Sequence, residues 1–191
     1  MGLVDGRKLR TNYEGLVERL RTDPGAGIVR PYVSTRLVRD VTVECSFEQY
    51  GRSFNFTGDE AVSRGGQERG PSPMRYFLSG IAFCMQGWWA KGSAMVGCQL
   101  DALELDLHTY MDMRGEHGQP DVLPHPQWLV FDVRVRSLDP TERVLAMIDW
   151  GNARCPLGSF GRQAVPIYER VSHNGRVVRD SVPAGLNIQA V

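Results

Sequence analysis

Cysteine is the residue type with the widest scope for chemistry in this chain of 191 residues. Its four cysteines are Cys45, Cys84, Cys98 and Cys155. A cysteine acts as a nucleophile or metal ligand as the thiolate, and an unperturbed thiol has a pKa near ~8.5. Cys45 lies in an alternating, strand-like segment and Cys98 precedes another one. We expect these two thiols to be small buried apolar side chains.

Cys84 lies in the apolar run "GPSPMRYFLSGIAFCMQGWWAKG", residues 70–92. On composition alone, core packing is the ordinary role of a cysteine in such a run. The helix N-terminus at Ser72 is about three turns away, and its effect on a pKa fades within the first turn. A reactive Cys84 would therefore need a cation from another element.

Three apolar side chains lie on the same side of the predicted helix as Cys84. At roughly 100° per residue, this side carries Phe77, Ile81 and Trp88. They would make an apolar pocket beside the thiol.

Cys155 lies in "NARCPLGSFG". A residue before proline is displaced from helical geometry, so Cys155 could cap a new turn that begins at Pro156. With Arg154 adjacent, we expect this thiol to be more acidic and more accessible than that of Cys84. The alternative is an ordinary surface cysteine in a loop.

Other chemistries have less support. His117 and His125 lie in loops, and the chain has no HxxxH or CxxC spacing, so we expect no metal site. The segment "GGQERG" lacks both the GxGxxG order and the lysine of a phosphate loop. No nucleophile-elbow motif supports serine catalysis. We expect no cofactor.

The composition is that of a soluble globular protein, with 42% hydrophobic and 23% charged residues. Because 22 basic residues balance 22 acidic ones, electrostatics give no reason to expect nucleic acid or an anionic membrane as partner. The longest apolar run is interrupted by Gln86, Gly87 and Lys91, so we expect no membrane span. Four cysteines without a secretory signal predict a cytoplasmic protein.

The periodicity predicts the elements that must position these thiols. Alternation predicts strands over 36–57 with a turn at Gly51, over 98–113, over 127–138, and on both sides of Asn174-Gly175. Helical spacing predicts helices over 10–21, from 72 to about 92, and after Asp139 as N-cap with Pro140 as first residue. The order of elements predicts an α+β fold rather than repeated βαβ units. The second helix is apolar nearly all round, so we expect it to be buried inside the protein.

Taken together, "GGQERGPSPMRYFLSGIAFC" and "ARCPLGSFG" resemble the OsmC/Ohr family. Members carry a Gly-rich loop, then a proline that opens a long helix, and a reactive cysteine eleven residues later. Pro73 and Cys84 have this spacing, and Cys155-Pro156 matches the second cysteine setting of the family. Asp59-Glu60 before the Gly-rich loop also matches. The resemblance covers residues 38–191 and leaves 1–37 as an N-terminal extension with a short amphipathic helix.

The resemblance implies an OsmC-like fold, in which antiparallel sheets wrap around a long buried central helix in an intertwined homodimer. It also implies a thiol-dependent peroxidase that reduces organic hydroperoxides in oxidative-stress defence. The Cys84 thiolate would become a sulfenic acid, and Cys155 would condense with it to a disulfide. A dithiol reductant would then reopen the disulfide.

One position departs from the family pattern. Hydroperoxide reductases of the family carry a glutamate directly after the helix-opening proline, where it holds an arginine against the thiolate. Met74 stands there in this chain. The nearest match to the family's arginine is Arg52, with Arg39 second, and Glu60 or Glu68 could hold it.

Two further hypotheses keep the fold without the peroxidase. In one, the protein is catalytically weak or inactive and binds an apolar small molecule in the pocket at the dimer interface. In the other, it is a dimeric partner protein that uses residues 1–35 as a docking element.

Overall fold

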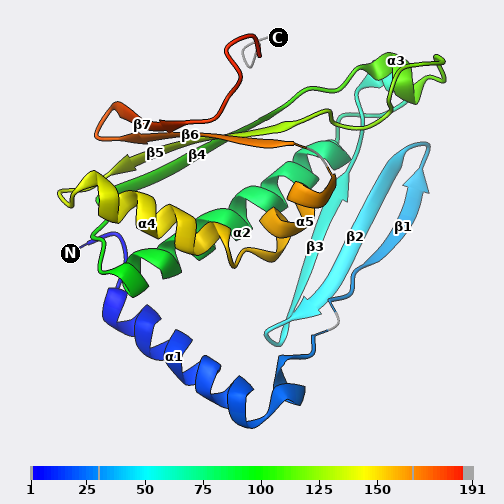
Figure 1. The fold of residues 1–191 in the computed structure, drawn as a ribbon. Helices are drawn as coiled ribbons and strands as arrows, with labels where there is room; N and C mark the ends of the chain where they lie inside the picture. Colours follow the sequence, from blue (N-terminus) through cyan, green and yellow to red (C-terminus); the bar gives the residue numbers. More distant parts are fainter. Residues whose placement is uncertain (1, 30, 165, 187–191) are drawn as a thin grey trace. The chain divides into compact units, whose positions relative to one another are not determined.

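A computed structural model describes residues 2–29, 31–164 and 166–186 of the chain (Figure 1). The elements in chain order are α1 (Gly6–Thr22), η1 (Pro24–Gly27), β1 (Ser34–Arg39), β2 (Thr42–Gln49), β3 (Arg52–Gly58), η2 (Val62–Arg64), α2 (Pro73–Val96), β4 (Ala102–Thr109), α3 (Met113–Glu116), β5 (Leu129–Arg136), α4 (Thr141–Asn152), α5 (Pro156–Ala164), β6 (Ile167–His173) and β7 (Arg176–Asp180). They form two compact units. Unit 1 comprises Met1–Gly15 and Ile81–Val191, and unit 2 comprises Leu16–Gly80.

Unit 2 is built on a three-stranded antiparallel sheet in the order β1-β2-β3. The predicted turn at Gly51 is present, with Tyr50 and Gly51 at φ of 55° and 68°. A second turn at Asp40, with φ of 51°, separates β1 from β2 and was not predicted. Asp is one of the few residue types that adopt positive φ at low cost, so its chemistry fits this turn. The predicted boundary at residue 37 falls inside β1.

Unit 1 is built on a four-stranded sheet in the order β4-β5-β6-β7. The pairs β4–β5 and β6–β7 are antiparallel, whereas β5 and β6 are parallel. The expectation of antiparallel sheets therefore does not hold at this one pair. The helices α4 and α5 connect β5 to β6, and a parallel pair needs such a crossover. The α+β class and the strand pair around Asn174-Gly175 are confirmed.

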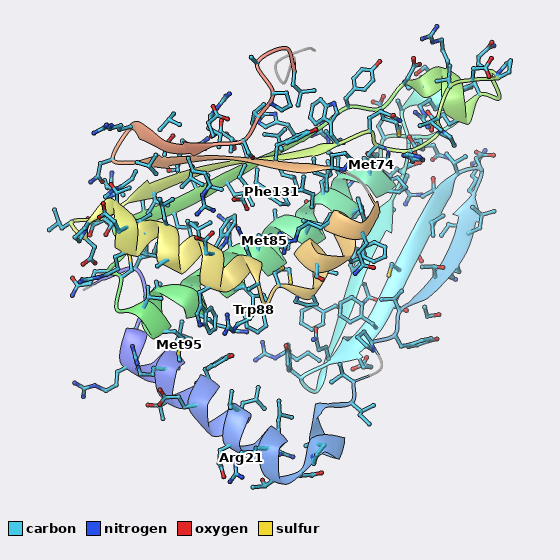
Figure 2. The ribbon with its side chains drawn as sticks, viewed as in Figure 1. Arg21, Met74, Met85, Trp88, Met95 and Phe131 are labelled. Atoms are coloured by element: carbon cyan, nitrogen blue, oxygen red, sulfur yellow. The ribbon has the colours of Figure 1, made fainter. Side chains whose placement is uncertain are left out.

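The core of unit 1 lies between its sheet and its helices. Figure 1 shows α2, α4 and α5 on the same side of this sheet. The fully buried side chains include Ile81, Met85, Trp89, Leu129, Phe131, Val133, Val144, Met147, Ile148 and Val171. Met85 of α2 and Phe131 of β5 are labelled in this interior in Figure 2. Burial of these apolar surfaces is the main stabilising contribution to the unit.

The helix α2 extends four residues beyond the predicted end and stops at Gly97. Gly97 has φ of +73°, and the N–H of Cys98 donates to the carbonyl of Ser93 at 2.8 Å. This is a Schellman motif, which needs a residue in the left-handed conformation just after the helix. Glycine supplies that conformation without steric cost.

Between Ile81 and Trp89, only one side of α2 is fully buried in this chain. Ile81, Met85 and Trp89 repeat every four residues on the buried side. Phe83 lies on the other side and is 73% exposed. The expectation of an all-round buried helix is therefore wrong for the single chain, although the apolar composition that motivated it is real.

The start of α4 differs from the prediction by one residue. Pro140 is the N-cap and Thr141 is the first helical residue. The Asp139 carboxylate instead accepts the backbone N–H of Gln99 at 2.6 Å and pairs with Arg143. Asp139 therefore ties the β5–α4 loop to the segment before β4, a long-range contact that the local sequence does not contain.

None of the helices described here combines the length and the apolar character needed to cross a membrane.

Candidate active site

The two cysteines singled out by their spacing lie in contact within unit 1. The Sγ atoms of Cys84 and Cys155 are 3.2 Å apart, although 71 positions separate the residues in the sequence. Both are free thiols. A disulfide bond would be about 2.0 Å long, so this is a reduced thiol pair joined by a hydrogen bond.

The junction between α4 and α5 positions Cys155. The helix α5 begins at Pro156, and the Cys155 carbonyl accepts the N–H of Ser159 at 2.9 Å. The Cys155 Sγ accepts the N–H of Gly158 at 3.3 Å. The sulfur therefore occupies the place of an N-capping side-chain oxygen. This confirms the prediction that Cys155 caps a helix that begins at Pro156.

The exposure of the two thiols is the reverse of the expected order. Cys155 is 0% exposed, whereas Cys84 is half-buried. Burial and, to a smaller extent, the Cys84 sulfur raise the pKa of Cys155 to about 11, although the Gly158 N–H acts in the opposite direction. The prediction that Cys155 is the more acidic and accessible thiol is wrong. At neutral pH it is protonated, and it donates its S–H to the Cys84 sulfur.

Arg154 does not lower the pKa of its neighbour because its side chain is engaged elsewhere. Its guanidinium lies 4.1 Å from the centre of the Trp150 ring and donates to the Trp150 carbonyl at 3.1 Å. Adjacency in sequence was therefore a poor guide to electrostatics at Cys155.

Glycines at the helix contacts allow the two thiols to meet. A Cβ at Gly158 of α5 would lie 2.6 Å from the Met85 sulfur of α2. A Cβ at Gly151 of α4 would lie 2.6 Å from a ring carbon of Trp89, also on α2. Real Cβ atoms do not approach other atoms so closely, so α2 contacts α4 and α5 at distances that only glycine permits. Sequence analysis missed this role of Gly151 and Gly158, for which the sequence carries no local signal.

Trp88, a predicted pocket residue, belongs to an aromatic cluster in unit 1. Its ring lies 6.0 Å from that of Trp150, and Tyr13 of α1 packs edge-on against both, at 6.4 and 5.1 Å. Lys91 Nζ lies 4.2 Å from the centre of the Trp88 ring. Figure 2 shows Trp88 on the side of α2 toward α1. Trp88 is half-buried by these contacts, one helical turn after Cys84.

The other predicted lining residues have different surroundings. Ile81 is 2% exposed and forms part of the core of unit 1. Phe77 is 44% exposed and lies two helical turns before Cys84 on α2, within unit 2. An apolar residue that is wholly in the core offers little surface to a substrate, and the part of Ile81 in a substrate pocket stays a prediction.

The candidate activating arginines lie in unit 2. Arg52 is an exposed residue at the start of β3, opposite Gln49. Arg39 pairs with Asp40 at 3.4 Å. Their action on Cys84 stays a prediction.

The acidic residues before and within the Gly-rich loop organise that loop. Asp59 is buried, and its carboxylate accepts backbone N–H groups of Glu60, Gln67 and Arg69 at 2.9, 3.2 and 3.0 Å. Burial alone would raise the pKa of Asp59, but these three hydrogen bonds reverse the effect and lower it.

The two glutamates proposed as holders of an arginine have local partners. Glu60 forms an ion pair with Arg64 at 3.2 Å. Glu68 accepts the Val62 N–H at 3.4 Å. Both contacts lie inside the Gly-rich loop region of unit 2, so the structure gives these glutamates a role in shaping that loop.

The remaining cysteines are distant from this pair in the sequence. Cys98 is buried as expected; burial raises the pKa of its thiol, and a 3.9 Å contact with the Ser137 hydroxyl opposes the shift. Cys45 is half-buried in β2, opposite Thr35 and Phe56. Across residues 2–29, 31–164 and 166–186, no three His, Cys, Asp or Glu side chains are grouped so that they could hold a metal ion.

Solved structures share this fold at low sequence identity. An OsmC-like protein from Mycoplasma pneumoniae superposes with a TM-score of 0.63 and 16% identity, covering 76% of this chain and 97% of its own. An organic hydroperoxide resistance protein OsmC from Legionella pneumophila gives 0.55 and 14%, with 76% and 98% covered. An organic hydroperoxide resistance protein from Elizabethkingia anophelis gives 0.57 and 10%, with 76% and 99% covered. No protein-family model and no curated protein sequence matches the chain.

Proposed function

We propose that this chain, whose fold is OsmC-like, is a cysteine-based hydroperoxide reductase, with Cys84 as the reacting thiol and Cys155 as the resolving thiol. The observation that carries the proposal is the 3.2 Å contact between one half-buried and one fully buried sulfur. A peroxide can reach the first sulfur, and the second is protected until the first is oxidised.

The reaction takes place in three steps. The Cys84 thiolate attacks the terminal oxygen of an organic hydroperoxide, the O–O bond breaks, and the alcohol leaves with a proton while Cys84 becomes a sulfenic acid. The Cys155 sulfur then attacks the Cys84 sulfur, which forms the disulfide and releases water. A dithiol reductant reopens the disulfide by two exchange steps and leaves as its own disulfide. In sum, hydroperoxide and dithiol become alcohol, water and disulfide.

The structure supports the second step through proximity. Two thiols held in contact react as an intramolecular pair, without the loss of translational freedom that a separate thiol would suffer. The hydrogen bond from Cys155 to Cys84 keeps the sulfurs adjacent before oxidation. For the first step we retain Arg52 as the cation that acts on Cys84, and Phe77 and Trp88 as contacts for the organic part of the substrate.

We also propose that the protein acts as a homodimer, as the resemblance implies. Two aromatic side chains close in sequence to the cysteines are exposed to solvent. Phe83, next to Cys84, is 73% exposed, and Phe160, five residues after Cys155, is 61% exposed. Aromatic residues are enriched in protein–protein interfaces, so these two are candidates for the contact between subunits. Sedimentation or light scattering of the purified protein tests the state directly, and a monomer at micromolar concentration would contradict this part of the proposal.

Mass spectrometry of the protein treated with one equivalent of cumene hydroperoxide tests the chemistry. The wild type should lose two hydrogens and yield a Cys84–Cys155 disulfide, which dithiothreitol reverses. A Cys155→Ser variant should stop at the sulfenic acid and be trapped by dimedone at Cys84. If Cys84 remains a thiol while the peroxide persists, the enzyme hypothesis is wrong. Binding of an apolar probe by wild type and Cys84→Ser alike would then favour the binding protein.

A further inference from the structure

A hydrogen-bonded chain of side chains joins the helices that carry the two thiols. Asn152 is the last residue of α4, three positions before Cys155. Its Oδ1 accepts the indole N–H of Trp89 at 3.0 Å, and its Nδ2 donates to Glu169 Oε1 of β6 at 2.6 Å. Trp89 lies on α2, five residues after Cys84. One amide therefore connects α2, α4 and the sheet.

Charged side chains extend this series of hydrogen bonds beyond Glu169. Arg179 of β7 donates to Glu169 Oε2 at 3.0 Å and pairs with Asp149 of α4 at 2.7 Å. Arg162 of α5 donates to the Asn152 carbonyl. The side chain and the backbone of Asn152 thus contact three other elements, namely α2, β6 and α5. The carbonyl at this helix end has no partner inside its own helix, and Arg162 supplies one.

The side-chain amide of Asn152 can make both hydrogen bonds in only one orientation. Trp89 is 0% exposed, so its N–H needs an acceptor inside the protein, and Glu169 needs a donor. Only the oxygen of Asn152 can serve the first and only the nitrogen can serve the second. An alanine at this position would leave the buried indole N–H of Trp89 without its partner.

Backbone hydrogen bonds fix the position of Cys155 relative to Asn152. The N–H groups of Arg154 and Cys155 both donate to the Gly151 carbonyl, at 3.0 and 2.9 Å. This tightened turn leaves little freedom between the end of α4 and the sulfur. The Cys84 sulfur follows α2 in the same way, since Trp89 and Cys84 share one continuous helix.

We propose that Asn152 is a positioning residue that sets the distance between the two thiols, and thereby the equilibrium between the dithiol and the disulfide. This rests on the proposed pairing of Cys84 with Cys155, but it concerns the pair itself and not the reaction with peroxide. Asn152 touches neither sulfur by any hydrogen bond described here and acts through α2 and α4.

Equilibration of the full chain in glutathione buffers tests the proposal without peroxide. Oxidised glutathione takes up two electrons and two protons from the dithiol, which gives the protein disulfide and two reduced glutathiones. After acid quench and alkylation, mass spectrometry gives the fraction of Cys84–Cys155 disulfide. Asn152→Ala should lower the equilibrium constant for disulfide formation about tenfold, equivalent to about 30 mV for this two-electron couple.

Two matched variants separate positioning from loss of stability. Val133→Ala removes volume from the core at β5, and the Val133 side chain has no polar atom with which to join the hydrogen bonds of Asn152. It should leave the constant within about twofold of the wild type at a comparable loss of Tm. Asn152→Asp places a carboxylate against Glu169 and should act like Asn152→Ala. Combining it with Glu169→Gln restores one donor and one acceptor in reversed order, and should recover most of the equilibrium constant.

The outcomes are distinct. An unchanged constant in Asn152→Ala, or a loss no larger than in Val133→Ala, would overturn the positioning role. So would the absence of any Cys84–Cys155 disulfide in the wild type under the most oxidising buffer. If Asn152→Ala fails to fold, the comparison of Asn152→Asp with its double variant decides. A different result would contradict the proposed function alone: glutathione forms the Cys84–Cys155 disulfide, but the protein does not consume cumene hydroperoxide.

Discussion

Cys155 is buried and keeps its proton at neutral pH. Burial raises the pKa of Cys155 to about 11, so this sulfur is a hydrogen-bond donor and a latent nucleophile. Cys84, by contrast, is only half-buried. A resolving thiol that stays protonated is protected from direct oxidation, because oxidants react with the thiolate.

The raised pKa of Cys155 predicts a loss of stability at alkaline pH. Below the ordinary thiol value of 9.0 the group is protonated in both folded and unfolded chains, and its contribution to stability is fully present. Between 9.0 and about 11 the unfolded chain binds fewer protons than the folded one, so the free energy of unfolding falls as pH rises. Urea denaturation of the reduced protein at pH 8 to 11 measures this fall in the free energy of unfolding. Cys155→Ser should remove this part of the slope, and an identical slope in the variant would contradict the assignment.

Gly158→Ala should disturb the thiol pair through packing. Its Cβ would lie 2.6 Å from the Met85 sulfur, so α5 must shift or Met85 must change rotamer. We expect a loss of about 1–3 kcal/mol in the free energy of unfolding and slower disulfide formation after peroxide. Gly87→Ala on α2 is the control, since no atom lies within 4 Å of its Cβ. It should gain about 0.5–1 kcal/mol through helix propensity.

Residue spacing in the sequence identified the thiol pair but not its asymmetry. The eleven positions from Pro73 to Cys84, and the Cys155-Pro156 cap, are local features that a sequence can carry. The burial of Cys155 depends on how α5 meets α2 through Gly158, a contact between distant segments. For that reason the thiol expected to be accessible is the one that is fully enclosed.

At the scale of elements, Asp59 shows how one carboxylate organises a loop. Three backbone N–H groups from the Gly-rich segment converge on it, and they lower its pKa despite burial. The pKa of Asp59 in the folded protein lies below the ordinary value of 3.8. The contribution of Asp59 to stability is therefore fully present above pH 3.8 and is lost as the pH falls through the folded pKa.

Asp59→Asn should therefore loosen the loop at neutral pH. An amide retains one acceptor oxygen and presents two donors to backbone N–H groups. We expect cleavage within residues 59–73 by a dilute protease to become several-fold faster, with cleavage elsewhere unchanged. Glu68→Gln, which keeps the acceptor for Val62, serves as control. Equal protection in Asp59→Asn and wild type would contradict the role.

The helix α1 packs on unit 1 through Tyr13, and Arg10 donates to the carbonyls of Ala94 and Met95 at 2.5 and 3.1 Å. Tyr13→Ala should cost about 1–2 kcal/mol, the value of two lost aromatic contacts with part of the buried ring. Tryptophan emission should move to longer wavelength as Trp88 and Trp150 gain solvent. Tyr13→Phe should behave as wild type. A Tyr13→Ala variant with unchanged Tm and emission would refute the contact.

The type of most elements could be predicted from periodicity, but their pairing could not. Alternation located the strands that became β4 and β5 to within a few residues. Nothing in a strand's own residues says that β5 and β6 run parallel, because that depends on the crossover through α4 and α5. The turn at Asp40 was missed because a continuous alternating pattern covers both strands.

At the scale of the whole molecule, the first residues of the chain are part of a compact unit. Residues 1–15 group with 81–191, and the Leu3 N–H donates to the Leu100 carbonyl at 3.1 Å. The separation of residues 1–37 from an OsmC-like domain of 38–191 stays a prediction. The contacts of Arg10 and Tyr13 give this segment an internal role, as its amphipathic pattern suggests.

The separation of 71 positions between Cys84 and Cys155 has a thermodynamic consequence. A bond between them would close a large loop and remove about 4 kcal/mol of chain entropy from the unfolded ensemble. The oxidised protein should therefore melt at a higher temperature than the reduced one, which calorimetry before and after peroxide would measure. Cys155→Ser should show no such rise. Each catalytic cycle would form and then reduce the Cys84–Cys155 disulfide. The protein would therefore be most resistant to unfolding while oxidant is present.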